Sequence, residues 1–368
     1  MPQAAGLLLN GRVPTPRPEI LTDRALNRAL LARQGLLEPL NGEAAEVVEL
    51  TGAVQAQNWA APPIAMWART AKRVDLTRAL EEGWLIYGVL LRGTLHMVSA
   101  SQYASYAAVV EGSGATARHR TKAAPSREMD RLRRELLVFA STPRSGLELV
   151  DFIEKWMAKH EPALDTDELD HQRKYGWRPL LRWHALMRAP ADGNWKRKVP
   201  TAQVAAPVSP DSWPTPERAL WDVVTWHLRA FGPATADDVA QWIGWRTPPV
   251  RAALEAMELE RFQDERGRKL YDLPEAPRPD PQTPAPPRLL PWFDNVILAY
   301  APAGRGRILP DDYKDRVYRR ANLQWLPTIL VDGMVAGTWA PRSCLNPFVA
   351  LPKAATVELE RLLAECPA

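Results

Sequence analysis

The segment over residues 216–273 constrains the fold of this 368-residue chain most strongly, because it predicts three helices and a hairpin in succession. Apolar residues recur between Leu220 and Phe231 at the three- and four-residue spacing of an amphipathic helix. Gly232 and Pro233 follow, and both residue types disfavour the interior of a helix. We therefore expect the first helix of this segment to end at Phe231.

Two shorter helices and two strands are predicted in the rest of this segment. Thr235 suits the N-cap of a helix over residues 236–243, and Pro248 suits the first turn of a third helix. Short strands are then expected over residues 260–263 and 269–272. Three helices followed by a β-hairpin is the order of a winged-helix unit, so the sequence predicts such a unit here.

Two further winged-helix units are predicted upstream of the unit over residues 215–273. The first covers residues 20–101, where short helices precede two strands that turn at Gly93. The second covers residues 129–204 and contains a wing turn at residues 192–195. The helices expected in these two units lie over residues 22–33, 43–51, 64–71, 75–82, 131–140, 147–159 and 178–186, and the strands of the first unit over residues 85–92 and 94–98.

The composition changes in the last quarter of the chain. Residues 274–291 are rich in proline and lack apolar periodicity, which predicts a semi-rigid linker. A β-rich unit is expected over residues 292–352, with a strand at 296–300 and a hairpin that turns at Asp332 and Gly333. The predicted fold class is therefore α+β and mainly helical, with tandem winged-helix units and a C-terminal β-rich unit.

The distribution of charge favours a polyanionic partner. The formal net charge is +4, and basic residues cluster at residues 118–122, 131–134 and 196–198. A solvated helix face explains any one cluster, but several clusters in one chain favour a polyanion. No apolar run is long enough to span a membrane, and the short apolar patch at residues 7–9 lacks a basic segment before it. We therefore expect a cytoplasmic, nucleoid-associated protein without a membrane partner.

Familiar catalytic motifs are absent from the sequence. It has no Walker-type phosphate loop, no dinucleotide-binding glycine motif after a strand and no Gly-x-Ser-x-Gly elbow. Its two cysteines, Cys344 and Cys366, belong to no Cys-x-x-Cys pair or Cys/His cluster, so neither a zinc site nor a disulfide framework is expected. Acidic pairs such as Asp237 and Asp238 fall on predicted surface helices, which disfavours a two-metal nuclease. We expect no metal and no cofactor.

The segment over residues 50–62 stands out because Gln55 and Gln57 flank a single alanine inside an otherwise apolar stretch. A buried amide without a hydrogen bond costs about 1–3 kcal/mol, so a glutamine inside a fold needs a partner. Two interpretations are open from composition alone. Either the amides cap a helix end or face solvent, or they hold a water molecule or the edge of a nucleobase.

Five short motifs follow one another along the chain. They are Val54-Gln55-Ala56-Gln57 with Pro62 and Arg69 beyond it, Arg92-Gly-Thr94-Leu-His96, Phe231-Gly-Pro-Ala-Thr-Ala-Asp237-Asp-Val-Ala-Gln-Trp242, Leu290-Pro-Trp-Phe-Asp294 and Val331-Asp-Gly-Met-Val-Ala-Gly337-Thr-Trp339. In this order they resemble motifs of the AlkZ-like DNA glycosylases, a family of winged-helix DNA-binding proteins, from about residue 20 to about residue 350. The related YcaQ-like branch has an aspartate at the position of Gln57, so the glutamine indicates the AlkZ-like branch.

The resemblance implies a monofunctional DNA glycosylase that hydrolyses the N-glycosidic bond of cationic alkylated bases. N7-alkylguanine and N3-alkyladenine already carry a positive charge, so the base leaves readily without a strong general acid. Crosslinked bases are included among the implied substrates. Gln55 and Gln57 then become the catalytic residues, because their amides position the attacking water. No lysine lies in this motif, so a Schiff-base lyase is not indicated.

The same resemblance implies DNA-binding or lesion-contacting residues around the glutamines. Arg69, Arg92, Thr94 and His96 are the residues expected in this role. His96 has a second interpretation, as a histidine whose hydrogen bonds are satisfied inside the predicted wing.

Four more arginines are candidates for DNA contacts. Arg246 and Arg251 flank the third helix of the unit over residues 215–273, where they either contact phosphates or stay solvated. Arg305 and Arg307 belong to a predicted flexible loop, which either enters a DNA groove as a probing hairpin or stays solvated.

Two other functions fit parts of the sequence. The main alternative is a non-enzymatic winged-helix protein such as a transcriptional regulator, and the other is a protein that sequesters a DNA-alkylating natural product. A regulator usually carries one winged-helix unit and a dimerisation or ligand domain. The repeated units and the lack of a coiled-coil seam favour the glycosylase, acting as a monomer on double-stranded DNA with alkylated bases.

Overall fold

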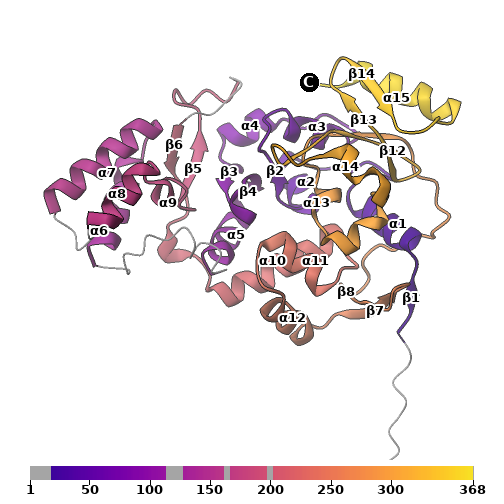
Figure 1. Ribbon diagram of the computed structural model, residues 1–368, viewed down its shortest axis with the longest axis horizontal. Helices are drawn as coiled ribbons and strands as arrows, with labels where there is room; N and C mark the ends of the chain where they lie inside the picture. Colours follow the sequence, from indigo (N-terminus) through magenta and orange to yellow (C-terminus); the bar gives the residue numbers. More distant parts are fainter. Residues whose placement is uncertain (1–17, 113–126, 161–165, 197–201, 368) are drawn as a thin grey trace, which may run out of the picture.

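The computed structural model describes residues 18–112, 127–160, 166–196 and 202–367, and it shows a mixed α/β fold in which helices predominate (Figure 1). The basic cluster at residues 118–122 lies outside the described residues, as do the apolar patch at residues 7–9 and part of the cluster at 196–198.

The N-terminal region alternates short helices with short strands. Its elements are β1 (Ile20–Leu21), α1 (Asp23–Arg33), α2 (Ala44–Thr51), β2 (Val54–Gln55), α3 (Ala61–Trp67), α4 (Leu76–Glu81), β3 (Leu85–Val89), the 3₁₀ turn η1 (Leu91–Gly93), β4 (Leu95–Ser99) and α5 (Ala100–Gly112). The helix starts follow local capping, because the side chains of Thr22 and Asp75 accept backbone hydrogen bonds at the starts of α1 and α4. The predicted helices and both predicted strands of this region are therefore present, within a few residues of the expected ends.

The next region contains four helices and a pair of strands. Its elements are α6 (Arg127–Phe139), α7 (Gly146–His160), α8 (Thr166–Lys174), α9 (Arg178–Leu181), β5 (Leu186–Ala189) and β6 (Ala202–Ala205). The helix expected over residues 178–186 is too long, because it ends at Leu181 and a strand begins at Leu186. Helices α6–α9 bury their own apolar cluster, which includes Leu136, Ile153 and Trp177, and they lie at one end of the molecule (Figure 1).

One five-stranded sheet joins these two regions. Its strand order is β2-β4-β3-β5-β6, and every neighbouring pair is antiparallel. The contact between them is the pairing of Tyr87 and Gly88 in β3 with Arg188 and Met187 in β5. The strands of the two predicted units therefore form one continuous sheet.

The segment that most constrains the fold has the expected elements. They are α10 (Pro216–Phe231), α11 (Ala236–Ile243), α12 (Thr247–Ala256), β7 (Glu260–Asp264) and β8 (Lys269–Asp272), preceded by the 3₁₀ turn η3 (Pro210–Ser212). Thr235 and Asp238 form a capping box at the start of α11, and Gly244 ends this helix with a φ of 85°. Strand β1 adds to the hairpin in parallel beside β7, so the sheet has three strands.

The C-terminal region is built on an antiparallel sheet of order β14-β13-β12-β9. Its elements are β9 (Arg288–Leu290), α13 (Asn295–Leu298), η4 (Pro302–Arg307), η5 (Asp311–Tyr313), α14 (Lys314–Val317), β10 (Tyr318–Arg319), β11 (Gln324–Trp325), β12 (Thr328–Val331), β13 (Met334–Ala340), β14 (Cys344–Pro347) and α15 (Lys353–Glu365). The hairpin over Asp332 and Gly333 is confirmed, and both turn residues have positive φ. The predicted linker over residues 274–291 contributes β9 to this sheet.

Two predictions for this region are wrong. The segment at 296–300 does not form a strand, because Asp294 caps the helix α13, which covers residues 296–298 and is followed by a turn. Val296, Ile297 and Tyr300 are all buried. When most residues of a short segment are buried, the pattern of apolar residues does not distinguish a helix from a strand. The predicted flexible loop at 303–307 is the compact 3₁₀ turn η4.

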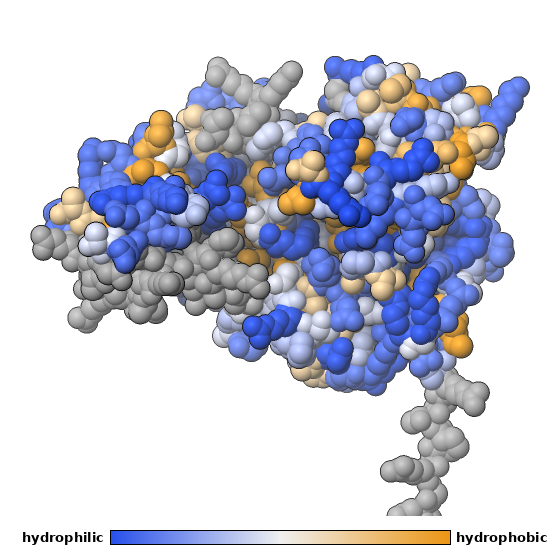
Figure 2. All heavy atoms as spheres, viewed as in Figure 1, coloured by the Kyte–Doolittle hydropathy of each residue, from blue (hydrophilic) through white to orange (hydrophobic). Residues whose placement is uncertain are grey.

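The largest apolar core joins the N-terminal region, the α10–β8 segment and the C-terminal region. It includes Leu30, Ile86, Val224, Trp242 and Tyr300, which come from all three. Figure 2 shows that hydrophilic residues cover most of one face, with apolar residues in small scattered groups. Within the described residues, no helix is both long enough and apolar enough to cross a membrane.

Candidate active site

The two glutamines follow a sharp turn at the end of α2. Gly52 makes this turn with a φ of 79°, and a Cβ atom at Gly52 would lie 3.0 Å from the ring of Phe231. A larger residue is disfavoured there by both the backbone conformation and the close contact. Strand β2 then carries Gln55, which is buried, and Gln57 emerges exposed two residues later.

The pairing of β2 with β4 continues one residue past the end of β2. The Ala56 amide donates to the Leu95 carbonyl at 2.8 Å. Gln57 lies in the bend that follows. His96 in β4 pairs directly with Gln55, so these two side chains lie on the same face of the sheet.

The guanidinium of Arg92 binds the side chain of Gln55. Its Oε1 atom accepts a hydrogen bond from Arg92 Nη2 at 3.3 Å. The other end of the guanidinium, Nη1, donates to the backbone carbonyl of Trp242, and the guanidinium carbon lies 4.6 Å from the centre of the Trp242 ring. Burial, and then the charge of Arg305, lower the pKa of Arg92 to about 10, so it stays ionised at neutral pH.

Gln57 is held by the backbone of the neighbouring strand. Its Oε1 atom accepts a hydrogen bond from the Leu95 amide at 3.2 Å. An amide N–H and a guanidinium N–H only donate, so each glutamine turns its carbonyl oxygen toward the protein. The contacts therefore fix which end of each carboxamide faces its partner.

His96 is a neutral, buried histidine. Its Nδ1 atom lies 2.9 Å from the Thr94 carbonyl, so Nδ1 carries the proton and donates it there. Burial first, and then the nearby Arg92 charge, lower the pKa of His96 to about 3. Its Nε2 atom has no partner among the described residues, so the interpretation as a fully satisfied histidine holds only at Nδ1. Thr94 uses its hydroxyl to donate to the Leu91 carbonyl at 3.1 Å.

An open groove of about 470 Å³ lies beside the glutamines. It is lined by Gln57, Asn58, Trp59, Phe293, Asn322 and Gln324. The lining combines carboxamides with aromatic rings and contains no charged side chain. Its residues come from the segment after β2, the turn before α13 and the β10–β11 hairpin.

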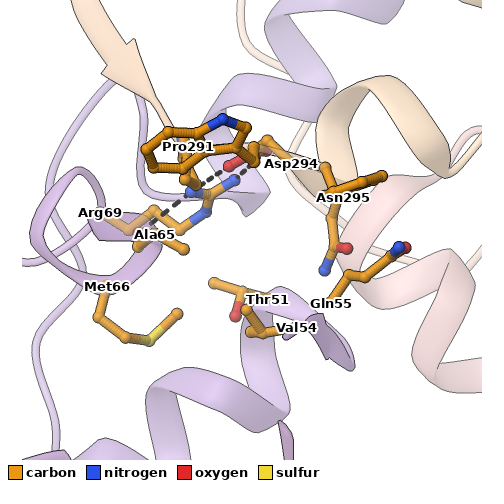
Figure 3. Close-up of a pocket in the computed structure, with 11 residues that line it drawn as sticks. Thr51, Val54, Gln55, Ala65, Met66, Arg69, Pro291, Asp294 and Asn295 are labelled. Atoms are coloured by element: carbon orange, nitrogen blue, oxygen red, sulfur yellow. Dashed lines mark hydrogen bonds and ion pairs between the residues drawn. The ribbon is translucent and has the colours of Figure 1, made fainter. Parts of the chain in front are cut away.

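Figure 3 shows a second, small cavity of about 10 Å³. Gln55 lines this cavity, and Phe293 lines both the cavity and the groove. The Nδ2 atom of Asn295 donates to the Ala53 carbonyl at 2.8 Å, while its buried Oδ1 atom has no partner among the described residues. A cavity of this size and polarity is about large enough for one water molecule.

Arg69 does not reach the surface, which corrects its prediction as a DNA-contacting residue. It forms a two-pronged ion pair with Asp294, at 2.7 and 3.0 Å, on the wall of the small cavity (Figure 3). Both side chains are buried, with exposed fractions of 2% and 1%. Its position predicts a structural role, because a guanidinium buried with a carboxylate is unavailable to phosphate.

Arg305 and Arg307 also differ from the prediction of a groove-probing hairpin. Arg307 is buried, donates to the Pro233 carbonyl at 2.8 Å and packs on the ring of Tyr300. Arg305 is half-buried and donates to the Ile297 carbonyl at 3.1 Å. Both side chains hold η4 against the core, together with Asn27, whose Nδ2 atom donates to the Arg307 carbonyl at 2.8 Å.

Arg246 and Arg251 are exposed at the start and on the first turns of α12. Among the described residues, neither guanidinium forms an ion pair, so both are free to meet a phosphate. Sequence reasoning missed Trp242, Phe293, Asn322 and Gln324 as site residues. Nothing in their local sequence shows that segments so distant along the chain meet the glutamines.

Comparison with known proteins decides the family. The family described as DNA glycosylase AlkZ-like matches residues 48–365. This chain belongs to the AlkZ-like DNA glycosylase family. It is therefore an enzyme of DNA repair, which confirms the prediction of a glycosylase over that of a transcriptional regulator. The matched region contains both glutamines and every element of the site described above.

The chain is also similar to a curated protein and, in its fold, to a solved structure. The chain is 26% identical over 333 residues to an interstrand DNA cross-link repair glycosylase of Streptomyces sahachiroi, covering 84% of this chain and 85% of the relative. Its fold matches the structure of Streptomyces sahachiroi DNA glycosylase AlkZ with a TM-score of 0.76 and 22% identity. That match covers 94% of this chain and 97% of the other, so the overall fold of the two is shared.

Proposed function

We propose that this DNA glycosylase hydrolyses the N-glycosidic bond of cationic alkylated bases in double-stranded DNA, with a water positioned by Gln55 and Gln57. N7-alkylguanine and N3-alkyladenine are the proposed bases. The observation that carries the proposal is the absence of a carboxylate from the groove lining, where carboxamides take its place. The nearest acid of the small cavity, Asp294, is already neutralised by Arg69.

A site built from carboxamides suits a substrate whose base is a good leaving group. A carboxamide has no useful basicity at neutral pH, so it orients a water without removing a proton from it. Catalysis then depends on positioning the water near the sugar C1′ atom. A cationic base supplies the rest of the driving force, because its glycosidic bond is already weakened. No lysine lines the groove, so the proposed enzyme is monofunctional.

The groove also bears on the size of the lesion. Its volume of about 470 Å³ and its open side leave room for a bulky adduct. The Streptomyces sahachiroi relative is named an interstrand DNA cross-link repair glycosylase. We therefore include crosslinked bases among the proposed substrates.

The remaining surface is proposed to hold the duplex. We propose tandem winged-helix units over residues 20–101, 129–204 and 215–273, acting together as a monomer. Arg246 and Arg251 at α12 are the proposed phosphate contacts.

Product analysis tests this proposal. A duplex with a single N7-methylguanine should release the free base and keep an intact strand with one abasic site. Borohydride should trap no enzyme–DNA adduct, because no amine attacks the sugar. A matched duplex with uracil, a neutral base, should release nothing above the spontaneous rate. Excision of uracil at a comparable rate would show that the site supplies an acid or base that the amides lack.

A further inference from the structure

Arg92 is a partly buried cation without a carboxylate partner. Within the described residues, no acidic side chain lies in ion-pair distance of it, whereas Arg33 and Arg69 both pair with buried aspartates. A cation taken out of water is stabilised by whatever acceptors and aromatic faces surround it. For Arg92 those are the Trp242 carbonyl, the Trp242 ring and the Oε1 atom of Gln55.

Arg92 has a backbone conformation that is unfavourable for arginine, which indicates a functional role for its side chain. Arg92 and Gly93 both have positive φ, at 57° and 69°, in the tight turn between β3 and β4. Asparagine followed by glycine is the usual choice for such a turn, and an arginine there is disfavoured. The turn directs the guanidinium inward to α11, where Gly244 lies close to the arginine stem.

We propose that Arg92 is a positioning residue that fixes the amide of Gln55 in the orientation needed to hold the attacking water. This inference rests on the proposed role of Gln55. A guanidinium only donates hydrogen bonds, so it keeps the Gln55 carbonyl oxygen turned toward itself and prevents the amide from flipping. The other lone pair of Oε1 and the amide N–H groups are then presented in one constant arrangement.

Trp242 makes this arrangement rigid. Its carbonyl accepts a hydrogen bond from the guanidinium, and its ring packs against the guanidinium carbon. The ring is buried and contacts the rings of His96 and His227. The side chain of Arg92 therefore connects Gln55 to helix α11, and Arg92 and Trp242 are 150 residues apart in the sequence. A lysine at position 92 would keep the charge but lose the planar fork that reaches both acceptors.

The replacement Arg92→Asn tests this role without straining the turn, because asparagine suits the left-handed conformation. We expect single-turnover excision of N7-methylguanine to fall about 10- to 100-fold, the loss typical of a misplaced reacting group. DNA affinity should stay within about twofold of the wild type, because the guanidinium is occupied by Trp242 and Gln55. Arg361→Gln in α15, which removes another arginine far from the site, should change neither quantity.

A double variant and a spectroscopic measurement separate positioning from other roles. If Arg92 acts through Gln55, then Arg92→Asn added to Gln55→Ala should cause no further loss of rate. The side-chain amide signal of Gln55 in ¹⁵N-glutamine-labelled protein should shift in Arg92→Asn, and this readout does not need activity. A weakened DNA affinity, a full additional loss in the double variant or an unchanged amide signal would overturn the inference. A wild-type rate for Gln55→Ala alone would instead overturn the proposed function.

Discussion

The buried ion pair between Arg69 and Asp294 gives the sharpest prediction for stability. Besides the pairing at 2.7 and 3.0 Å, Arg69 donates to Gln34 Oε1 at 3.2 Å and to the Ala65 carbonyl at 3.1 Å. Asp294 also caps α13 by accepting from the Val296 amide at 3.1 Å. The pair therefore joins the end of α3 to the turn that carries the wall of the groove.

Asp294→Asn breaks this pair with little change of shape. Asparagine caps a helix as well as aspartate does, but it removes the negative charge and places an N–H donor where one carboxylate oxygen accepted from Arg69 Nη1. Breaking a buried pair leaves an uncompensated charge, and we expect the free energy of unfolding to fall by about 3–5 kcal/mol. Urea denaturation followed by fluorescence measures this loss as a lower midpoint.

Two further variants complete this experiment. Arg69→Met combined with Asp294→Asn removes the stranded cation and should recover much of the lost stability. Glu365→Gln breaks the solvent-exposed pair with Arg361 and should barely move the midpoint. A loss below about 1 kcal/mol for Asp294→Asn would refute the reasoning that this pair is desolvated.

Two other predictions concern pH and DNA affinity. Burial lowers the pKa of His96 to about 3 and that of His227 to about 4, while an unfolded histidine titrates near pH 6.5. Below pH 6.5 the unfolded chain therefore binds protons that the folded chain does not. The free energy of unfolding should fall by about 1.4 kcal/mol per pH unit for each histidine as pH drops from 6.5 to 4. A urea midpoint that is constant between pH 7 and pH 5 would contradict this. Arg246→Ala and Arg251→Ala should each weaken DNA binding and reduce its salt dependence by about one counterion in anisotropy titrations, whereas Arg307→Ala should lower stability and leave the salt dependence unchanged.

Local sequence signals predicted the elements that local chemistry determines. The order of α10, α11, α12 and the β7–β8 hairpin followed from a capping threonine, prolines at helix starts and glycines at helix ends. The hairpin over Asp332 and Gly333 followed from its turn residues. These contacts all lie within a few residues of one another, so the sequence contains the information directly.

Long-range contacts were beyond the reach of the sequence. Strand β2 has only two residues, and the pairing of β3 with β5 joins residues about a hundred positions apart. The family resemblance predicted a DNA contact for Arg69, and the predicted flexible loop gave one for Arg307. The local sequence does not show that both side chains are buried among polar partners. Their burial became visible only with the fold.

Some residues of the candidate site could likewise be predicted from the local sequence, and others could not. Gln55 and Gln57 were predicted because two amides in an apolar stretch need a reason, and because their motif resembles that of a known family. The contact of Arg92 with Trp242 and the placement of Asn322 beside Gln57 were not predicted. Both depend on how distant elements pack, and neither leaves a pattern in the local sequence.

The most direct test of the account compares the wild-type enzyme with Gln55→Ala and Gln57→Ala on a duplex that carries one N7-methylguanine. Single-turnover base release and DNA affinity are measured for each protein under the same conditions. The account predicts release by the wild type and loss of release in both variants, with DNA affinity retained. A wild-type rate of release in either variant would contradict the central claim that the two amides position the attacking water.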